Sequence, residues 1–120
     1  MKLDHVQIAA PRGCEADARR FFGQLLQLRE VKKPASLYRR GGVWFELEDD
    51  RQLHVGVEEP FRPALKAHPA FAIGIEEIDG LAKVLTEAGA IVEWDESLPG
   101  YRRFYTADPW GNRIELLARL

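Results

Sequence analysis

Apolar and polar residues follow one another with a period of two in several short segments of the chain. Side chains of a β-strand point alternately to its two faces, so such segments are expected to form half-buried strands. Gly, Pro and clusters of acidic residues separate them and mark turns. The predicted strands are residues 3–10, 38–40, 43–47, 52–57, 68–75, 91–94, 102–107 and 113–118.

Two other segments have the period of an amphipathic helix. From Glu15 onward apolar residues recur at spacings of three and four, and the same pattern begins again at Ile78 and stops at Gly89. Such a stripe is typical of a helix lying on a sheet, and a glycine after the last turn is a common terminator. The stripe residues are Ala18, Phe21, Phe22, Leu25 and Leu28 in the first helix, and Ile78, Leu81, Ala82 and Leu85 in the second.

The order of these elements is an internal repeat. Both halves read strand, helix, strand, strand, strand, and Glu59-Pro60-Phe61-Arg62-Pro63 separates them with two prolines in four residues. We therefore expect an α+β fold in one domain, made of a βαβββ module at 1–59, a linker at 60–65 and a second βαβββ module at 66–120. Two four-stranded sheets, each covered by one helix, are expected to enclose an eight-stranded cup with the helices outside.

Composition excludes several classes of protein. The chain has 120 residues, 46% of them hydrophobic, and a net charge of -2, which fits one globular domain and argues against nucleic acid as a partner. No apolar run approaches the roughly 20 residues that span a bilayer. Cys14 is the single cysteine, so no intramolecular disulfide can form. A reducing, cytoplasmic location and a small-molecule partner are therefore expected.

The last stretch of the chain places one carboxylate in an apolar strand. Asp108 to Asn112 has the Pro, Gly and Asn residues of a tight turn, and residues 113–118 then form the final strand. Ile114 and Leu116 share one face of that strand, so Glu115 points to the other. An inward carboxylate requires a cation, a metal ion or solvent.

The three histidines of the chain share this arrangement. His5 and His54 lie 49 residues apart and His68 and Glu115 lie 47 apart, and each pair joins the first strand of a module to its last. All four are predicted on the sheet face away from the helix. Imidazoles and a carboxylate suit Zn, Ni, Mn or Fe(II). The alternative is a polar site without metal, in which Glu115 pairs with Arg103 or with a protonated histidine.

These residues resemble the vicinal-oxygen-chelate superfamily over essentially the whole chain. The resemblance depends on the repeat, on a histidine early in each module, and on the closing motif. The segments concerned are Leu3-Asp4-His5-Val6, Ala67-His68-Pro69-Ala70-Phe71 and Asp108-Pro109-Trp110-Gly111-Asn112-Arg113-Ile114-Glu115-Leu116. That superfamily contains glyoxalase I, extradiol dioxygenases, fosfomycin-resistance thiol transferases and bleomycin-resistance proteins.

The resemblance implies that His5, His68 and Glu115 hold a divalent metal. His54 falls where glyoxalase I has a second glutamate, so the chain departs from that enzyme at this position. Extradiol dioxygenases are usually longer and carry further acid-base histidines, which this chain lacks. The potassium-binding loop of fosfomycin transferases is also absent from the sequence. Pro69, which has no backbone donor, indicates a sheet edge or a bulge next to His68.

Three further residues are candidates for binding a substrate. Arg103 and Tyr105 share a strand face, where Arg103 could hold a carboxylate or phosphate, and Trp44 could form an apolar wall. The alternatives are a solvated surface strand for Arg103 and interface packing for Trp44. Cys14 at a helix start could have a lowered pKa, but no histidine is near it in sequence to act as a base.

Two functions from different classes are compatible with the sequence. The first is a metal-dependent enzyme, a lyase or dioxygenase of the superfamily, in which the ion acts as a Lewis acid on two neighbouring oxygens of a small substrate. Glu115 and His54 are then the catalytic residues, with His54 a fourth ligand or the general base, and Arg103 positions the substrate. The second is a metal-free protein that sequesters a small molecule, as bleomycin-resistance proteins do. A homodimer is expected, because sheet edges and aromatic residues such as Trp44 and Trp94 require cover.

Overall fold

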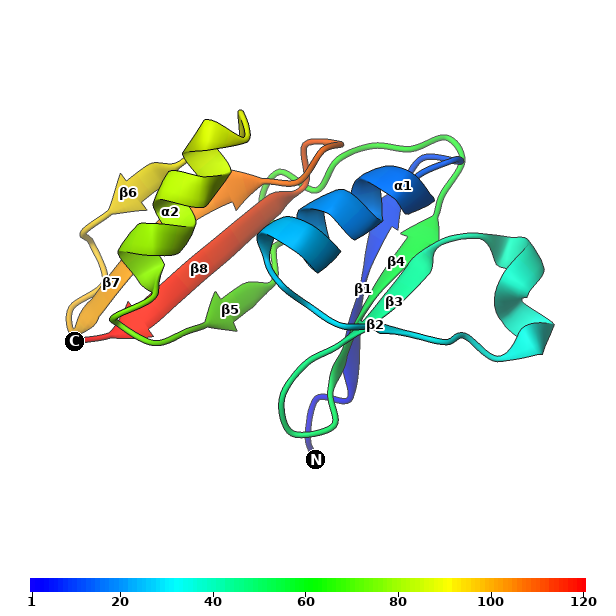
Figure 1. The fold of residues 1–120 in the computed structure, drawn as a ribbon, viewed down its shortest axis with the longest axis horizontal. Coiled ribbons are helices and arrows are strands. Elements are labelled where there is room, and N and C mark those ends of the chain that lie inside the picture. The colour runs from blue at the N-terminus through cyan, green and yellow to red at the C-terminus, as the bar shows by residue number, and fades with distance from the viewer. The chain divides into compact units, whose positions relative to one another are not determined.

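The computed structural model describes residues 1–120, and Figure 1 shows the course of its elements. The chain divides into two compact units, which we call module 1 (Met1–Pro63) and module 2 (Ala64–Leu120). The boundary between them falls within the predicted linker 60–65. None of the helices has the length and apolar composition that crossing a membrane requires.

Module 1 is a four-stranded sheet with one long helix. The sheet has the order β1-β4-β3-β2, with β1 parallel to β4 and the other neighbours antiparallel. A π-helical segment continues directly from α1, so the predicted first helix is confirmed and extends to Leu25. The elements are β1 (His5–Ala10), α1 (Glu15–Ala18), a π-helix (Arg19–Leu25), β2 (Glu30–Val31), a 3-10 helix (Ala35–Arg40), β3 (Val43–Glu46) and β4 (Gln52–Val57).

Module 2 repeats this topology. Its sheet has the order β5-β8-β7-β6, again with the first strand parallel to the last and the other neighbours antiparallel. The predicted internal repeat and the α+β fold class of two βαβββ modules are therefore confirmed. The elements are β5 (Ala70–Ala72), α2 (Ile78–Glu87), β6 (Glu93–Asp95), β7 (Tyr101–Ala107) and β8 (Arg113–Arg119).

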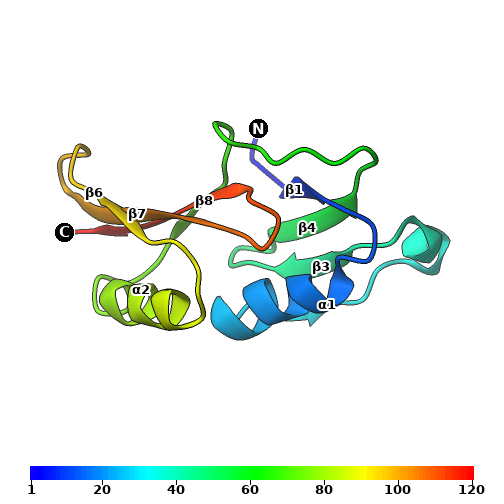
Figure 2. The same cartoon turned by 90° about the horizontal axis from the view of Figure 1, so that it is seen from above.

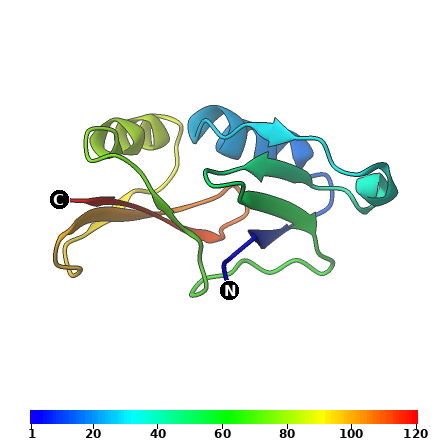
Figure 3. The same ribbon diagram turned by 90° about the horizontal axis from the view of Figure 1, so that it is seen from below.

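The helix of each module covers one face of its own sheet. In module 1 the helix lies over one face of the sheet (Figure 3). It directs Phe21 and Phe22 inward, and the Phe22 ring lies 5.8 Å from that of Phe45 on β3. In module 2, α2 packs on β7 and β8 (Figure 2), and its Ile78 and Leu85 are buried. Burial of such side chains contributes roughly 1.5–3 kcal/mol each. The opposite face of each sheet is therefore the one that can carry polar groups.

The second strand of module 1 was predicted wrongly. Residues Tyr38 to Arg40 lie in a 3-10 helix that follows Pro34, with φ of -55°, and ends at Gly41, with φ of 73°. None of the three has a buried side chain, so nothing holds them on a sheet. The strand is instead Glu30–Val31, which pairs with Trp44 and Phe45. Two residues are too few to produce a visible alternation.

Two strands of module 2 have other bounds than predicted. The predicted strand 68–75 is reduced to β5, so His68 precedes the strand. Pro69 cannot donate to a ladder, and β5 is the edge strand of its sheet, as the proline indicated. The predicted strand 91–94 begins two residues later, at Glu93.

The closing turn fixes the start of β8. The Asp108 carboxylate accepts hydrogen bonds from the backbone N–H of Trp110 and of Asn112 and from the Asn112 side chain, at 3.0, 2.8 and 2.7 Å. Gly111 has φ of 92°, a left-handed conformation that glycine adopts without strain. Burial raises the pKa of Asp108, and the hydrogen bonds from Asn112 and Trp110 oppose that rise.

Candidate functional site

The sheet face of module 2 that points away from α2 carries a charged network. Along β7 and β8 alternate residues point to the α2 side, and most of these, including Phe104 and Leu116, are buried. The residues between them, Arg103, Tyr105 and Glu115 among them, share the opposite face because side chains alternate. Tyr105 and Glu115 are directly paired across the two strands.

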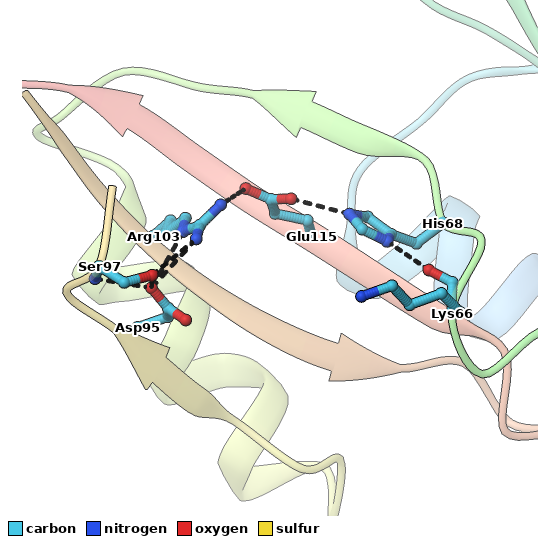
Figure 4. A network of polar contacts seen from close by, with 6 residues as sticks. All are labelled: Lys66, His68, Asp95, Ser97, Arg103 and Glu115. Carbon is cyan, nitrogen blue, oxygen red and sulfur yellow. Dashed lines mark hydrogen bonds and ion pairs between the residues drawn. The ribbon is translucent and has the colours of Figure 1, made fainter. Parts of the chain in front are cut away.

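Glu115 is the centre of this network, and only 6% of its side chain is exposed. Its Oε1 accepts a hydrogen bond from Arg103 Nη1 at 3.1 Å, and its Oε2 lies 2.9 Å from His68 Nε2 (Figure 4). The structure therefore brings three of the predicted site residues together. A carboxylate held this way is desolvated but compensated on both oxygens.

His68 has an acceptor at each ring nitrogen. Its Nδ1 lies 2.9 Å from the Lys66 carbonyl oxygen, which can only accept a hydrogen bond, so Nδ1 carries a proton. A neutral ring then has a lone pair at Nε2, facing the Glu115 carboxylate. This contact is satisfied by one proton shared between Nε2 and Oε2, or by a second arrangement in which both bind one cation. The second is the usual orientation of a metal-bound histidine, in which a carbonyl fixes the tautomer.

Arg103 is already occupied by residues of the chain. Besides Glu115 it contacts the Asp95 carboxylate at 3.1 Å and the Ser97 hydroxyl at 3.2 Å, and its side chain is 15% exposed. Hydrogen bonds from Ser97 and from Arg103 lower the pKa of Asp95. These contacts indicate that Arg103 positions Glu115, whereas the sequence predicted a role in substrate binding.

Tyr105 carries a second arginine on its ring. The Arg113 guanidinium carbon lies 3.9 Å from the ring centroid, and the His68 ring meets Tyr105 edge to face at 5.5 Å. Sequence reasoning did not select Arg113. Its position two residues before Glu115 on the same strand was the signal that could have identified it.

The corresponding face of module 1 carries a stack of rings. The Trp44 and His54 rings are 3.9 Å apart with an angle of 2° between their planes, and the His5 ring follows at 4.3 Å from that of His54. Trp44 therefore has one ring face covered by His54. The three predicted site residues of module 1 lie together, as do the four of module 2.

In each imidazole of this stack, a neighbouring acceptor indicates which ring nitrogen carries the proton. His5 Nδ1 lies 2.8 Å from Asp4 Oδ2, and His54 Nε2 lies 2.8 Å from Gln52 Oε1. These acceptors leave the lone pairs on His5 Nε2 and on His54 Nδ1. Burial, with the charge of His5 as a second cause, lowers the pKa of His54 to about 4. His54 is consequently neutral at pH 7, which suits a ligand better than a general base.

The strand register shows which residues of the two modules are equivalent. His54 is paired with Trp44 and Gln7, and Glu115 is paired with Tyr105 and Ala70. Glu115 therefore takes the place of His54, and Tyr105 that of Trp44. Two residues before Gln7 and Ala70 lie His5 and His68, which are equivalent in the same sense.

The donor set fits a divalent ion in part. His68 and Glu115 present a nitrogen and an oxygen 2.9 Å apart, which matches two adjacent ligands at about 2.1 Å from one ion. In both His5 and His68, Nε2 is the ring nitrogen whose lone pair is available to a metal ion. No group of three or more His, Cys, Asp or Glu side chains in the structure could by itself hold a metal ion. The predicted set of His5, His54, His68 and Glu115 thus remains a prediction.

Cys14 has no features of a reactive thiol. It is 1% exposed, and burial, together with the charge of Glu15, raises its pKa. The lowered pKa considered from the sequence is therefore wrong, and the residue belongs to the core.

Comparison with known proteins gives a consistent result. No family model and no curated protein matches the chain. Among solved structures, a glyoxalase family protein from Bacillus anthracis is 43% identical, with 100% of this chain and 96% of that chain covered and a TM-score of 0.92. A glyoxalase/dioxygenase from Nostoc punctiforme is 22% identical, covering 99% and 91% with a TM-score of 0.81.

A third structure extends the comparison. Lactoylglutathione lyase from Agrobacterium tumefaciens is 18% identical, covering 98% of this chain and 92% of that chain with a TM-score of 0.73. At such identities the Nostoc and Agrobacterium proteins show the shared fold only. The Bacillus protein is similar in sequence over the whole length, and the chain therefore belongs to the glyoxalase family of the vicinal-oxygen-chelate superfamily.

Proposed function

We propose that this protein is a divalent-metal-dependent enzyme acting on a small molecule through two neighbouring oxygens. His5, His68 and Glu115 are the proposed ligands, with His54 as a fourth. The ion, which is Zn, Ni, Mn or Fe(II), supplies Lewis acidity that withdraws electrons from the bound oxygens. The reaction is that of a lyase or a dioxygenase.

The observation that carries the proposal is the orientation of the two equivalent histidines. Asp4 holds Nδ1 of His5, and the Lys66 carbonyl holds Nδ1 of His68. In both rings Nε2 is left as the nitrogen that can bind a metal ion, and in His68 it faces the nearly buried carboxylate of Glu115. Hydrogen-bonded partners of this kind raise ligand basicity and fix ring orientation.

The other residues of the two faces have supporting roles. Arg103 holds Oε1 of Glu115, which turns Oε2 toward His68. His54, neutral and stacked between Trp44 and His5, keeps a lone pair on Nδ1 that can bind the ion or accept a proton. Trp44 closes the stack and presents an apolar surface beside it.

The test is the metal content of the purified protein, followed by titration of the metal found. Glu115→Gln keeps the shape of the side chain and removes its charge, so we expect metal affinity to fall about a hundredfold with the fold retained. Glu30→Gln is the matched control, because Glu30 is also a strand glutamate paired with an arginine, Arg19, and it lies opposite Phe45 on the helix-covered side of its sheet. Equal affinities in wild type and Glu115→Gln would remove the proposal.

A metal-free binding protein is the second candidate. Arg103 already pairs with Glu115, and the other carboxylate oxygen is within hydrogen-bond distance of His68, so Glu115 has partners on both oxygens without an ion. In that case the purified protein contains no stoichiometric metal, and added metal leaves its thermal unfolding unchanged.

We also propose that the protein is a homodimer. Large apolar side chains such as Ile91 and Trp94 are 59% and 42% exposed in the single chain. Isologous pairing is the commonest way to cover such residues. Sedimentation at micromolar concentration measures this, and a monomer alone would contradict it.

A further inference from the structure

Arg113 differs from the other arginines of the chain. Arg103 and Arg113 are the two arginines whose side chains are partly buried, whereas the rest are exposed. Arg103 has two carboxylate partners, Asp95 and Glu115. Arg113 has none, and its guanidinium makes only the stack on Tyr105 at 3.9 Å. A partly desolvated cation without a counter-ion is unfavourable unless something else supplies the charge.

The stack leaves the donors of Arg113 available. A guanidinium lying on an aromatic ring uses its flat face, and the N–H groups at its edge stay free to form hydrogen bonds. Those donors form a planar fork that matches a carboxylate in a bidentate pair. Tyr105 restricts the motion of the arginine, so less conformational entropy is lost when an anion binds.

The position of Arg113 relates it to the proposed metal ligands. Arg113 and Glu115 are two residues apart on β8, so they share a face and their Cα atoms lie about 7 Å apart. Tyr105 connects the two, because it is paired across the strands with Glu115 and its ring meets that of His68. An anion bound by Arg113 would therefore lie beside the oxygens of a substrate at His68 and Glu115.

We infer that Arg113 binds the carboxylate of the substrate, and that the substrate is a small organic acid carrying two neighbouring oxygens at its other end. The part of this inference that concerns the two neighbouring oxygens rests on the proposed function. The part that concerns the carboxylate rests on the geometry of Arg113. The equivalent residue of module 1 is Gln52, which is neutral and holds His54, so the carboxylate site belongs to module 2.

The experiment compares two probes that differ by one carboxylate. Catechol has two neighbouring oxygens, and 3,4-dihydroxybenzoate has the same two oxygens and a carboxylate. Isothermal titration of the full chain, loaded with the metal it contains or metal-free if it contains none, measures both dissociation constants. We expect wild type to bind the acid at least about tenfold more tightly, the usual value of a charge-assisted pair.

Three variants assign that preference to a residue. Arg113→Gln should abolish it, raising the dissociation constant of the acid about tenfold while that of catechol stays the same. Arg113→Lys keeps the charge and loses the fork, so it should retain part of the preference. Arg119→Gln is the matched control on the same strand, since Arg119 also lies over a tyrosine, Tyr101, and it should bind both probes as wild type does.

Several results would overturn the inference. Wild type that binds neither probe, or both equally, has no carboxylate site of this kind. If Arg119→Gln loses the preference for the acid, the preference comes from the general charge of the surface. If Arg113→Gln keeps the preference, another residue binds the carboxylate. Equal weakening of both probes in Arg113→Gln and Arg113→Lys would show a structural role. Preference for the acid in a protein that binds no metal would support Arg113 and remove the proposed metal function.

Discussion

The two modules have the same backbone and different chemistry on the face away from the helix. At equivalent positions of the strands, module 1 has Trp44, His54 and Gln52, which form a stack of rings and an amide contact. Module 2 has Tyr105, Glu115 and Arg113, which belong to a network of charges. Only the histidine two residues before Gln7 or Ala70, which is His5 or His68, is common to both.

This difference shows which properties a repeat retains. The ladder of backbone hydrogen bonds is independent of side-chain identity, so both sheets keep one topology and one register. Side chains on the open face can diverge because they do not pack against the helix. One divergence is enforced by the backbone: the position of Arg103 in module 2 corresponds to Gly42 in module 1, where an added Cβ would lie 2.0 Å from the Val55 carbonyl oxygen. Module 1 therefore has no place for a counterpart of Arg103.

The helix-covered faces differ in a subtler way. Val43 and Phe45 of β3 are equivalent to Phe104 and Thr106 of β7, so the large aromatic residue occupies the first position in one module and the second in the other. All four are buried. The total volume is conserved, and its distribution along the strand is not.

The largest expected effect concerns these two aromatic residues. Phe45→Ala and Phe104→Ala should each lower the free energy of unfolding by about 3–5 kcal/mol, because both rings are fully buried and leave a cavity. Urea denaturation measures this. A loss confined to one of the two variants would break the comparison, since it would mean that one module contributes little to global stability.

The second effect concerns the closing turns. Asp108→Ala should cost about 2–3 kcal/mol, because buried donors of Trp110 and Asn112 lose their acceptor. Asp49 in the corresponding turn of module 1 is exposed with φ of 59°. Asp49→Asn, which tolerates that conformation, is the control and should change stability by less than about 0.5 kcal/mol.

Asp108 also predicts a pH dependence. Burial raises its pKa in the folded chain above the ordinary value of 3.8. A raised pKa favours the protonated form in the folded state, so the contribution to stability is present below the ordinary value and is lost as pH rises through the raised one. The stability of wild type relative to Asp108→Asn should therefore decrease as pH rises from about 4 toward 7, measured by urea denaturation at each pH. A constant difference would contradict the raised pKa.

The third effect addresses the charge network. Arg103→Gln removes a cation from Glu115, which should strengthen the attraction of this carboxylate for a divalent ion by up to about tenfold. Arg102→Gln is the control, because Arg102 lies next to it on β7 and pairs with Asp79 instead. Competition with a chelator of known affinity gives both constants. Weaker metal binding in Arg103→Gln would show that orienting Glu115 matters more than balancing its charge.

The smallest effect concerns Thr106, whose buried hydroxyl has no hydrogen-bond partner. Thr106→Val removes this group at nearly constant volume and should raise the free energy of unfolding by about 1 kcal/mol. Thermal and urea unfolding measure the gain. A loss of stability would indicate that the hydroxyl has a partner in solution.

The sequence alone determined the fold class and the repeat. Strand alternation, two apolar helical stripes and a proline-rich linker are local properties, so the order of elements and the ends of β4, β7 and β8 could be predicted to within a residue or two. Glu115 was identified for the same reason, since a carboxylate between Ile114 and Leu116 must point away from the buried face. The short strand β2 and the 3-10 helix were missed because their pattern covers too few residues.

Only the tertiary structure decided what each site residue contacts. Register places Trp44 against His54, Tyr105 against Glu115 and Asp95 against Arg103, and the turn after β6 brings Ser97 to Arg103. Those contacts are the reason why we infer anion binding for Arg113 and not for Arg103, and burial lowers the pKa of His54 to about 4. The sequence could not show this, because hydrogen bonding and desolvation depend on groups brought together from distant parts of the chain.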